Sequence, residues 1–482
     1  MRDIFMDAAL ADITDGLWTY LLIPVVVLLG LFFTIQSKGV QFRMFPEMFR
    51  AVARKSAPDG AGGKPVSSFG AFTISAAARV GTGNVAGVAA AITLGGAGAV
   101  FWMWVMAVIG AASAFAESTL AQLYKVRDNK SFRGGPAYYM KFGLNAKWMG
   151  MIFAVVITLT FALAFNSVQA NTITATMVSA FGMPADSATP SVIIGLALVA
   201  LTALVVFGGV TRLVSVTTML VPVMAIVYLL LGGVVVIMNL HNLPMVIGQI
   251  VSSAFGLQEM AAGGLGAAIM QGVRRGLFSN EAGLGSAPNA GAAASVRHPV
   301  SQGLVQALGV FFDTILVCSI TAFTILFANP TLAGNDETGA NLTQSALVTN
   351  LGSWAGVALA VVIFMLAFSS VLGNYYYGES NVEFLVGRKG LPVLRVLVLI
   401  AVFVGAVGSF ATVWAVADLM MALLALINLA ALAPLSKTAF RLLADYVAQR
   451  KAGVEEPVFT KDRMPELRNV QVWDSADVPV KN

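Results

Sequence analysis

Two short runs of glycine and polar residues interrupt otherwise apolar stretches of this chain. The first is Gly81-Thr82-Gly83-Asn84, and the second is Ser279-Asn280-Glu281-Ala282-Gly283. Glycine is a poor helix former, so such a run unwinds a helix. The free N–H groups of an unwound segment favour a carboxylate, and its free carbonyl groups favour Na⁺. The residue types therefore predict non-covalent binding of a zwitterion together with a cation.

Other chemistry fits these residues less well. The spacing Gly81-x-Gly83-x-x-x-Gly87 differs from that of a nucleotide-binding loop, and no strand precedes it. Ser369 and Ser370 have no His or Lys at a convincing position to activate them as nucleophiles. Close packing of small residues between helices stays open as an alternative for either run alone. Two runs at matched positions favour binding over packing.

The composition is that of a membrane protein. Of 482 residues, 58% are hydrophobic and only 11% are charged, whereas soluble proteins carry about 25% charged residues. One cysteine, Cys318, excludes an intramolecular disulfide, and two histidines are too few to suggest a metal centre. The net charge of +5 could suggest a nucleic acid as partner. Because the basic residues lie in loops between apolar stretches, membrane topology explains them better.

The apolar stretches are long enough to cross a bilayer, for which roughly 18 residues are needed. We count eleven of them, at 15–37, 67–95, 98–124, 148–181, 189–208, 211–239, 258–294, 302–328, 353–384, 391–409 and 411–434. The first lacks a preceding basic stretch and a clear cleavage site, so we interpret it as a retained span and not as a signal peptide. The predicted fold class is an all-α integral membrane protein with 11 transmembrane helices.

The distribution of Lys and Arg predicts the orientation, because cytoplasmic loops retain positive charge. Of the 29 basic residues, 25 fall on one side of the predicted spans. This places the N-terminus outside and the C-terminus in the cytoplasm, in a bacterial-type inner membrane. Residues 242–255 are amphipathic and are expected along the outer interface. The tail 452–482 is polar and is expected to be a loosely ordered extension, in which changes after Glu455 have little effect.

The interrupted spans also divide the chain. Once the first span and its connector are set aside, five spans begin at residue 67 and five at residue 258, and each set begins with an interrupted span. Because five is an odd number, the second set enters the membrane from the opposite side, and the repeat must be inverted. The predicted units are 1–66, 67–257, 258–434 and a cytoplasmic tail, 435–482. Corresponding breaks in two halves are the strongest indication of a transport site that a sequence offers.

Six motifs make the chain similar to the alanine or glycine:cation symporter family, also called sodium:alanine symporters. The motifs are Gly81-Thr82-Gly83-Asn84-Val85-Ala86-Gly87-Val88, Glu117-Ser118-Thr119-Leu120-Ala121-Gln122, Arg133-Gly134-Gly135-Pro136-Ala137-Tyr138-Tyr139-Met140, Val168-Gln169-Ala170-Asn171, Ser279-Asn280-Glu281-Ala282-Gly283-Leu284-Gly285-Ser286-Ala287-Pro288 and Ala367-Phe368-Ser369-Ser370-Val371-Leu372-Gly373-Asn374-Tyr375-Tyr376-Tyr377-Gly378-Glu379. The resemblance covers nearly all of residues 15–450. It implies a leucine-transporter-type fold with one additional N-terminal helix, and a transporter that is not an enzyme.

The resemblance also implies which residues bind the amino acid. Those that would contact its polar groups are Thr82, Gly83 and Asn84 at the carboxylate, with Gln169, Ser279 and Asn280. Those that would bound its side chain are Leu277, Ser370 and Asn374. The resemblance makes alanine and glycine the leading substrates. Some members carry the bulkier Trp at the position of Asn374, so the pocket here could be wider and could admit serine or glutamine.

The same resemblance implies a Na⁺ site, with Na⁺ as the coupling ion and no other cofactor. Its ligands would be the backbone carbonyls of Ala77 and Val80 and the hydroxyls of Ser369 and Ser370. A carrier of the same fold that couples to H⁺ is one alternative, although a titratable carboxylate would then be expected at the site. A channel or an amino-acid-sensing receptor is the alternative from another class. The oligomeric state is left open.

Carboxylates within the spans are expected to be paired, because an unpaired charge in the membrane is costly. For Glu281 we expect a pairing with Arg79, Arg274 or Arg275 that holds the broken helix, with gating or a direct contact with the ion or the substrate as the alternatives. Four further acids are expected to make hydrogen bonds between helices: Glu117, Asp313, Glu379 and Asp418.

Overall fold

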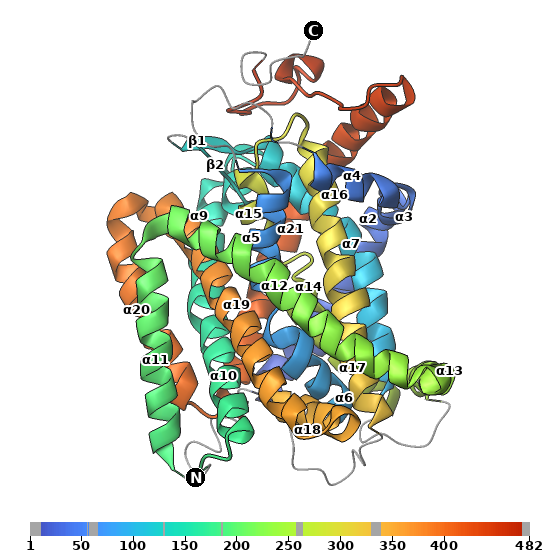
Figure 1. The fold of residues 1–482 in the computed structure, drawn as a ribbon. Coiled ribbons are helices and arrows are strands. Elements are labelled where there is room, and N and C mark those ends of the chain that lie inside the picture. Colours follow the sequence, from blue (N-terminus) through green and yellow to red (C-terminus); the bar gives the residue numbers. More distant parts are fainter. Residues whose placement is uncertain are drawn as a thin grey trace.

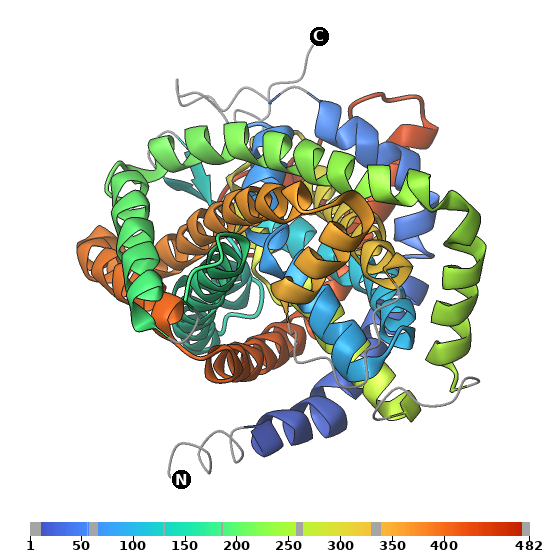
Figure 2. The ribbon, with the colours of Figure 1, turned by 60° about the horizontal axis from the view of Figure 1, so that its bottom comes forward.

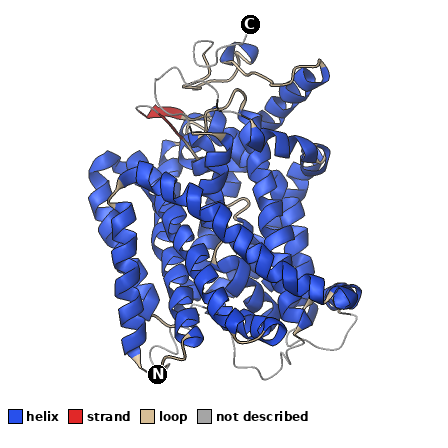
Figure 3. Ribbon diagram, viewed as in Figure 1, coloured by secondary structure: helices blue, strands red, loops and turns tan. Residues whose placement is uncertain are grey.

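The computed structural model describes residues 11–54, 56, 66–128, 131–184, 187–256, 264–328 and 339–474. These residues are almost entirely helical (Figure 3). The exception is a pair of short strands, β1 (Val126–Asp128) and β2 (Ser131–Arg133), which are antiparallel with Arg127 opposite Phe132.

The helices follow one another with short connections. Those before residue 257 are α2 (Ile23–Gln36), α3 (Val40–Arg43), α4 (Phe45–Ala53), α5 (Ser68–Arg79), α6 (Val88–Gly95), α7 (Gly98–Leu123), α8 (Pro136–Phe142), α9 (Lys147–Ile157), α10 (Asn166–Ala180), α11 (Ala188–Val206), α12 (Gly209–Met238) and α13 (Leu243–Ala254). Those after it are α14 (Gly264–Asn280), α15 (Ala287–Ala293), α16 (Pro299–Val310), α17 (Ser319–Phe327), α18 (Ala340–Leu351), α19 (Trp354–Val386), α20 (Leu391–Val407) and α21 (Phe410–Lys451). Segments of π-helix at Trp18–Leu22, Gly83–Gly87, Thr158–Phe165 and Phe311–Cys318 join some of these into longer helices, and 3-10 turns lie at Leu240–Asn242, Gly387–Gly390 and Lys461–Arg463.

Within the described residues, eight helices are long and apolar enough to cross a membrane. They are Ala11–Gln36, Gly98–Leu123, Lys147–Ala180, Ala188–Val206, Arg212–Met238, Pro299–Phe327, Trp354–Val407 and Phe410–Lys451. The helix Trp354–Val407 contains both α19 and α20. The two interrupted segments fall outside this set because each is divided into shorter helices. The all-helical class is confirmed, whereas the eleven spans and the inverted repeat stay predictions, and the expected boundary at residues 257–258 lies outside the described residues.

The two interrupted segments lie in the interior of the bundle. Residues 73–92 and 271–296 are buried throughout. α14 packs against α7, and α5 packs against α19, α12 and α15. α12 runs obliquely across the front in Figure 1, and Figure 2 places α11 and α12 (green) at the periphery. The outer helices thus shield two broken helices whose backbone could not face lipid.

The two ends of the bundle differ. α13 and α18 lie at one end, at the bottom of Figure 1, while α4, the two strands, α15 and the last described residues lie at the other. We call these the α18 end and the tail end. The amphipathic segment predicted at 242–255 is the short helix α13, whose Val246 and Ile250 are buried.

The prediction of a loosely ordered tail is wrong for the part that the structure describes. α21 continues to Lys451, and the chain then folds back over the tail end up to residue 474. Phe459 is 0% and Trp473 is 1% exposed. The segment is polar on average, but it contains a few apolar side chains that pack on the tail end of the bundle. Residues 475–482 lie outside the described residues.

Candidate functional site

The first helix break lies between α5 and the π-helical segment Gly83–Gly87, as the glycine run predicts. The Gly81 N–H donates to Oδ1 of Asn84 over 2.9 Å, and the Thr82 N–H donates to Oε1 of Gln169 over 3.2 Å. A Cβ at Gly81 would collide with the Ser370 hydroxyl. Glycine is required there because α19 approaches the unwound backbone so closely. The side chains of Asn84 and Gln169, both predicted to lie in the binding site, therefore hold the unwound backbone.

The second break follows Asn280, the last residue of α14. Glu281, Gly283 and Gly285 have positive φ angles of 57°, 83° and 76°, which ends the helix. The carboxylate of Glu117 accepts the Gly283 N–H over 3.2 Å and the Gly285 N–H over 3.1 Å. The Asn428 amide donates to the same carboxylate over 2.9 Å. Glu117 thus makes the interhelical hydrogen bonds expected of it, and it also fixes the shape of the break.

Asp313 joins the two breaks. It lies in the π-helical segment Phe311–Cys318, and its carboxylate accepts from the Asn84 amide over 2.6 Å and from the Ser279 hydroxyl over 2.5 Å. The Asn84 amide also lies 3.1 Å from the Ser279 hydroxyl oxygen. Asn84 and Ser279 therefore meet directly, although nearly two hundred residues separate them. The sequence marked Asp313 only as a hydrogen-bonded acid, since a single acid in an apolar helix does not reveal its partners.

Asn280 is held beside this bridge. Its amide nitrogen donates to the Thr314 hydroxyl over 3.2 Å, and its Oδ1 accepts the Ala282 N–H over 3.0 Å. Leu277, one turn earlier, is fully buried, and its carbonyl accepts the Glu281 N–H over 2.9 Å. Both residues line the end of α14 at the break.

Three of the four residues expected at the Na⁺ site come together. The Ser370 hydroxyl lies 2.9 Å and the Ser369 hydroxyl 3.4 Å from the Ala77 carbonyl oxygen. Val80, the fourth, is buried at the start of the break. The Ser369 hydroxyl also contacts the Met224 sulfur over 3.1 Å, so α12 covers this side. Carbonyl and hydroxyl oxygens are ligands that suit a hard cation.

Asn374 lies one turn beyond Ser370 on α19. Its amide nitrogen donates to Oδ1 of Asn166 over 3.0 Å, while its own Oδ1 has no hydrogen-bond partner among the described residues. The Thr82 hydroxyl is also buried without a partner there. Buried polar atoms are usually paired, so unpaired ones near a break are available to a ligand.

An aromatic series leads from this centre toward the α18 end. Phe165 lies 4.6 Å from Phe278, Phe278 lies 5.0 Å from Trp414, and Trp414 lies 5.3 Å from Phe410, measured between ring centroids. Phe410 also lines an open cavity of about 500 Å³ that contains Asn171. Phe278 also lies against Gly83, so a series of neighbouring rings links the cavity to the first break.

The expected pairing of Glu281 with Arg274 or Arg275 is wrong. Arg274 pairs with Asp15 over 2.6 Å, and Arg275 pairs with Asp418. Glu281 instead accepts from the Ser286 hydroxyl over 2.6 Å. Because Glu281 follows the end of α14 with a positive φ, it leaves the helical direction that the two arginines share.

The remaining candidate partner, Arg79, donates to the Gln306 carbonyl oxygen over 3.1 Å. No ion pair between Arg79 and Glu281 is present among the described residues. Glu379, which was expected to make an interhelical hydrogen bond, has one carboxylate oxygen without a partner in the same part of the chain.

The architecture with two interrupted helices is the leucine-transporter-type fold. The crystal structure of MhsT in complex with L-phenylalanine has a TM-score of 0.54 at 15% identity, and the match covers 76% of this chain and 89% of that chain. At this identity the likeness shows the fold alone.

The family follows from the sequence comparisons. The model of the sodium:alanine symporter family matches residues 3–461. The amino-acid carrier protein AlsT of Bacillus subtilis is 50% identical over 462 residues, which are 96% of each chain. The probable sodium/glutamine symporter GlnT of the same organism is 47% identical, over 96% of this chain and 95% of that protein. The chain belongs to the sodium:alanine symporter family, whose members are transporters and not enzymes.

Proposed function

We propose that this protein is a secondary active symporter that carries a small neutral amino acid together with Na⁺. The observation that carries the proposal is the meeting of the two helix breaks through Asn84, Asp313 and Ser279. Two unwound segments at one point offer N–H donors to a carboxylate and carbonyl oxygens to a cation. The family of the chain supports amino-acid symport with Na⁺.

The amino-acid carboxylate is proposed to bind at the first break. Thr82, Gly83 and Asn84 supply its contacts, and Gln169, Ser279 and Asn280 surround them. The unpaired Thr82 hydroxyl supports this position, because a bound carboxylate would give it an acceptor. Gln169 now accepts the Thr82 N–H, so substrate binding would require that hydrogen bond to be exchanged.

The Na⁺ is proposed to bind beside the same break, between Ala77, Val80, Ser369 and Ser370. None of these ligands needs to lose a proton, which favours Na⁺ over H⁺ as the coupling ion. In this proposal Na⁺ enters from the α18 end, outside the cell, and stabilises the state open to that side. Rocking of helix sets then opens the tail end to the cytoplasm, in agreement with the basic residues counted there.

Alanine and glycine are the proposed substrates, and glutamine is the second candidate. The unpaired Oδ1 of Asn374 favours glutamine, since it could accept from a side-chain amide. The relative GlnT, a probable sodium/glutamine symporter at 47% identity, points the same way. Competition of labelled alanine uptake by a panel of amino acids separates the two. If glutamine inhibits alanine uptake and glycine does not, glutamine becomes the leading substrate in place of alanine.

Uptake into proteoliposomes tests the coupling. Labelled alanine is expected to accumulate under an inward Na⁺ gradient at equal pH on both sides. The same uptake without Na⁺ would refute the proposal, and uptake driven only by a pH gradient would identify the H⁺-coupled alternative. Preloading the vesicles with unlabelled alanine should accelerate entry of the label, because a carrier exchanges substrate and a channel does not.

A further inference from the structure

The C-terminal tail is fastened to the tail end of the bundle by specific contacts. The Trp473 indole N–H donates to the Gln122 carbonyl oxygen over 3.0 Å, and the Phe459 N–H donates to the Arg297 carbonyl oxygen over 2.9 Å. The Lys461 N–H donates to the Trp473 carbonyl oxygen over 2.9 Å, which ties the two ends of this segment together. We call residues 456–473 the tail loop. It is a closed loop seated on the bundle by its two buried aromatic side chains.

The surface beneath the tail loop contains the ends of both interrupted segments. Val66, just before α5, accepts the N–H of Ser295, just after α15, over 2.9 Å. The Gln122 side chain donates to the Ala294 carbonyl oxygen over 2.9 Å and to the Gly291 carbonyl oxygen over 2.6 Å. Gln122 therefore holds α15 through its amide while its backbone carbonyl seats the tail loop. One residue of α7 connects the tail to a broken helix.

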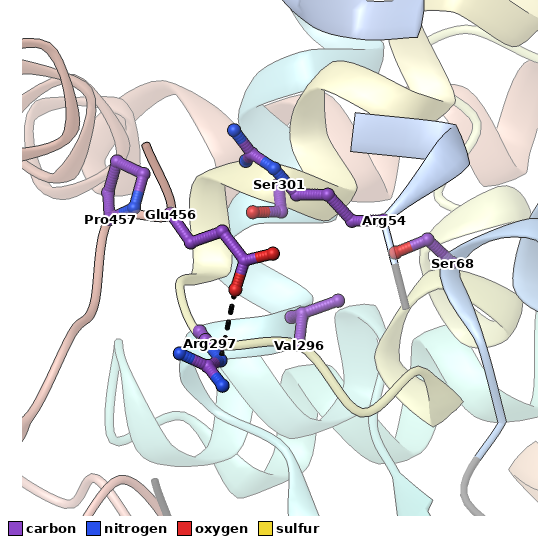
Figure 4. A pocket seen from close by; sticks show the side chains of 7 residues that line it. All are labelled: Arg54, Ser68, Val296, Arg297, Ser301, Glu456 and Pro457. Atoms are coloured by element: carbon purple, nitrogen blue, oxygen red, sulfur yellow. Dashed lines mark ion pairs between the residues drawn. The ribbon is translucent and has the colours of Figure 1, made fainter. Parts of the chain in front are cut away.

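A small pocket remains between the tail loop and the bundle (Figure 4). Glu456 and Pro457 line it from the tail side, and Ser68 and Ser301, at the beginnings of α5 and α16, line it from the other. Glu456 pairs with Arg297 over 3.4 Å across the edge of this pocket. The tail loop is therefore one wall of an opening at the beginning of α5.

Buried polar groups without partners lie between this opening and the first break. Gln302 and Gln306, one turn apart on α16, have both ends of their amides unpaired among the described residues, and so has the Thr119 hydroxyl on α7. Arg79 reaches the Gln306 carbonyl oxygen, while its Nε and Nη2 lack partners in the same part of the chain. Unpaired polar groups within a membrane are costly unless water reaches them. These residues form a polar strip from the break toward the tail loop.

We propose that the tail loop is the gate of the substrate route at this end of the molecule. The proposal rests on the transport function above, since a carrier that alternates its access must close each end in turn. While Trp473 is seated on the Gln122 carbonyl, the loop covers the end of the polar strip, beside the bonds by which the Gln122 amide holds α15. When Trp473 leaves, this cover is lost, and water and substrate reach the strip.

The test measures access to the polar strip and needs no transport. Full-length Gln302→Cys is compared with the double variant Gln302→Cys/Trp473→Ala in lipid nanodiscs, during reaction with a membrane-impermeant maleimide. The parent protein gives the background from the native Cys318, which is 1% exposed. We expect Trp473→Ala to accelerate labelling at position 302 by roughly tenfold or more. A factor of ten corresponds to about 1.4 kcal/mol, less than loss of a buried indole usually costs.

Two further variants test whether the acceleration is specific to the indole of Trp473. Arg468 is exposed in the same loop, so Gln302→Cys/Arg468→Ala should be labelled at the rate of Gln302→Cys alone. Trp473→Phe keeps an aromatic ring but lacks the N–H donor, and it should give an intermediate rate. Equal rates in the Trp473→Ala and Arg468→Ala variants would overturn the gate. An absence of Na⁺-coupled uptake by the parent would overturn the proposed function, and the labelling result would stand separately.

Discussion

The proposed Na⁺ site is most directly tested by Ser370→Ala. The Ser370 hydroxyl lies 2.9 Å from the Ala77 carbonyl oxygen and 3.0 Å from the Leu366 carbonyl oxygen. Alanine removes only this oxygen and fits the same buried space. Loss of an oxygen ligand from a cation resembles loss of a hydrogen bond to a charged group, about 1.5–3 kcal/mol. At about 1.4 kcal/mol per factor of ten, the Na⁺ half-saturation should rise roughly 10- to 150-fold.

The assay is the Na⁺ dependence of initial alanine uptake in proteoliposomes. Ser380→Ala is the matched control, because Ser380 is a buried serine of the same helix whose hydroxyl has no partner among the described residues. Its Na⁺ half-saturation should stay at the value of the parent protein. An unchanged half-saturation in Ser370→Ala, or an equal rise in both variants, would refute the assignment of Ser370 as a cation ligand.

Three further predictions concern the breaks and the tail. Asn280→Ala removes the acceptor of the Ala282 N–H and the donor to Thr314, a loss of about 1–3 kcal/mol, so initial uptake at saturating Na⁺ should fall roughly 5- to 150-fold. Glu117→Gln replaces one acceptor of the Gly283 and Gly285 N–H groups by a donor, so the thermal unfolding temperature should fall, whereas Glu379→Gln should change it less. Acidification from pH 7.5 to 5.5 should release the tail. Limited proteolysis should then cleave the chain faster after residue 451, and a cleavage rate that does not change with pH would contradict the prediction.

The pH prediction depends on His298 and its neighbours. Its Nδ1 accepts the Val300 N–H over 3.2 Å, so the neutral ring carries its proton on Nε2, which faces Asp445 over 3.2 Å. Burial lowers the pKa of His298, although the hydrogen bond to Asp445 raises it, and the charges of Arg463 and Arg54 lower it further. A base whose pKa is lowered in the packed state stabilises that state above its ordinary pKa, about 6.5. The stabilisation is lost as the pH falls below that value.

The positions of both breaks could be predicted because glycine acts locally. Gly81 and Gly83 disrupt a helix whatever surrounds them, and the same holds for the glycines after Asn280. The partner of a buried acid is decided by packing between distant helices. Asp313 could have faced any of several helices, and only the assembled bundle brings it to Asn84 and Ser279. The pairing of Glu281 with Arg274 or Arg275 failed for a local reason, since its positive φ turns it away from the helix that carries both arginines.

The tail was misjudged for a different physical reason. Its order depends on isolated apolar anchors such as Phe459 and Trp473, which are too far apart to give a periodic pattern. Trp473 also needs an acceptor, and it uses the Gln122 carbonyl, which lies in the last turn of α7. The last carbonyls of any helix lack partners within that helix, so every helix whose C-terminal end lies at this side of the membrane offers such an acceptor. Which of these carbonyls accepts from Trp473 depends on where α7 ends in the folded bundle. The accepting residue, Gln122, also holds α15, the helix that continues the second interrupted segment.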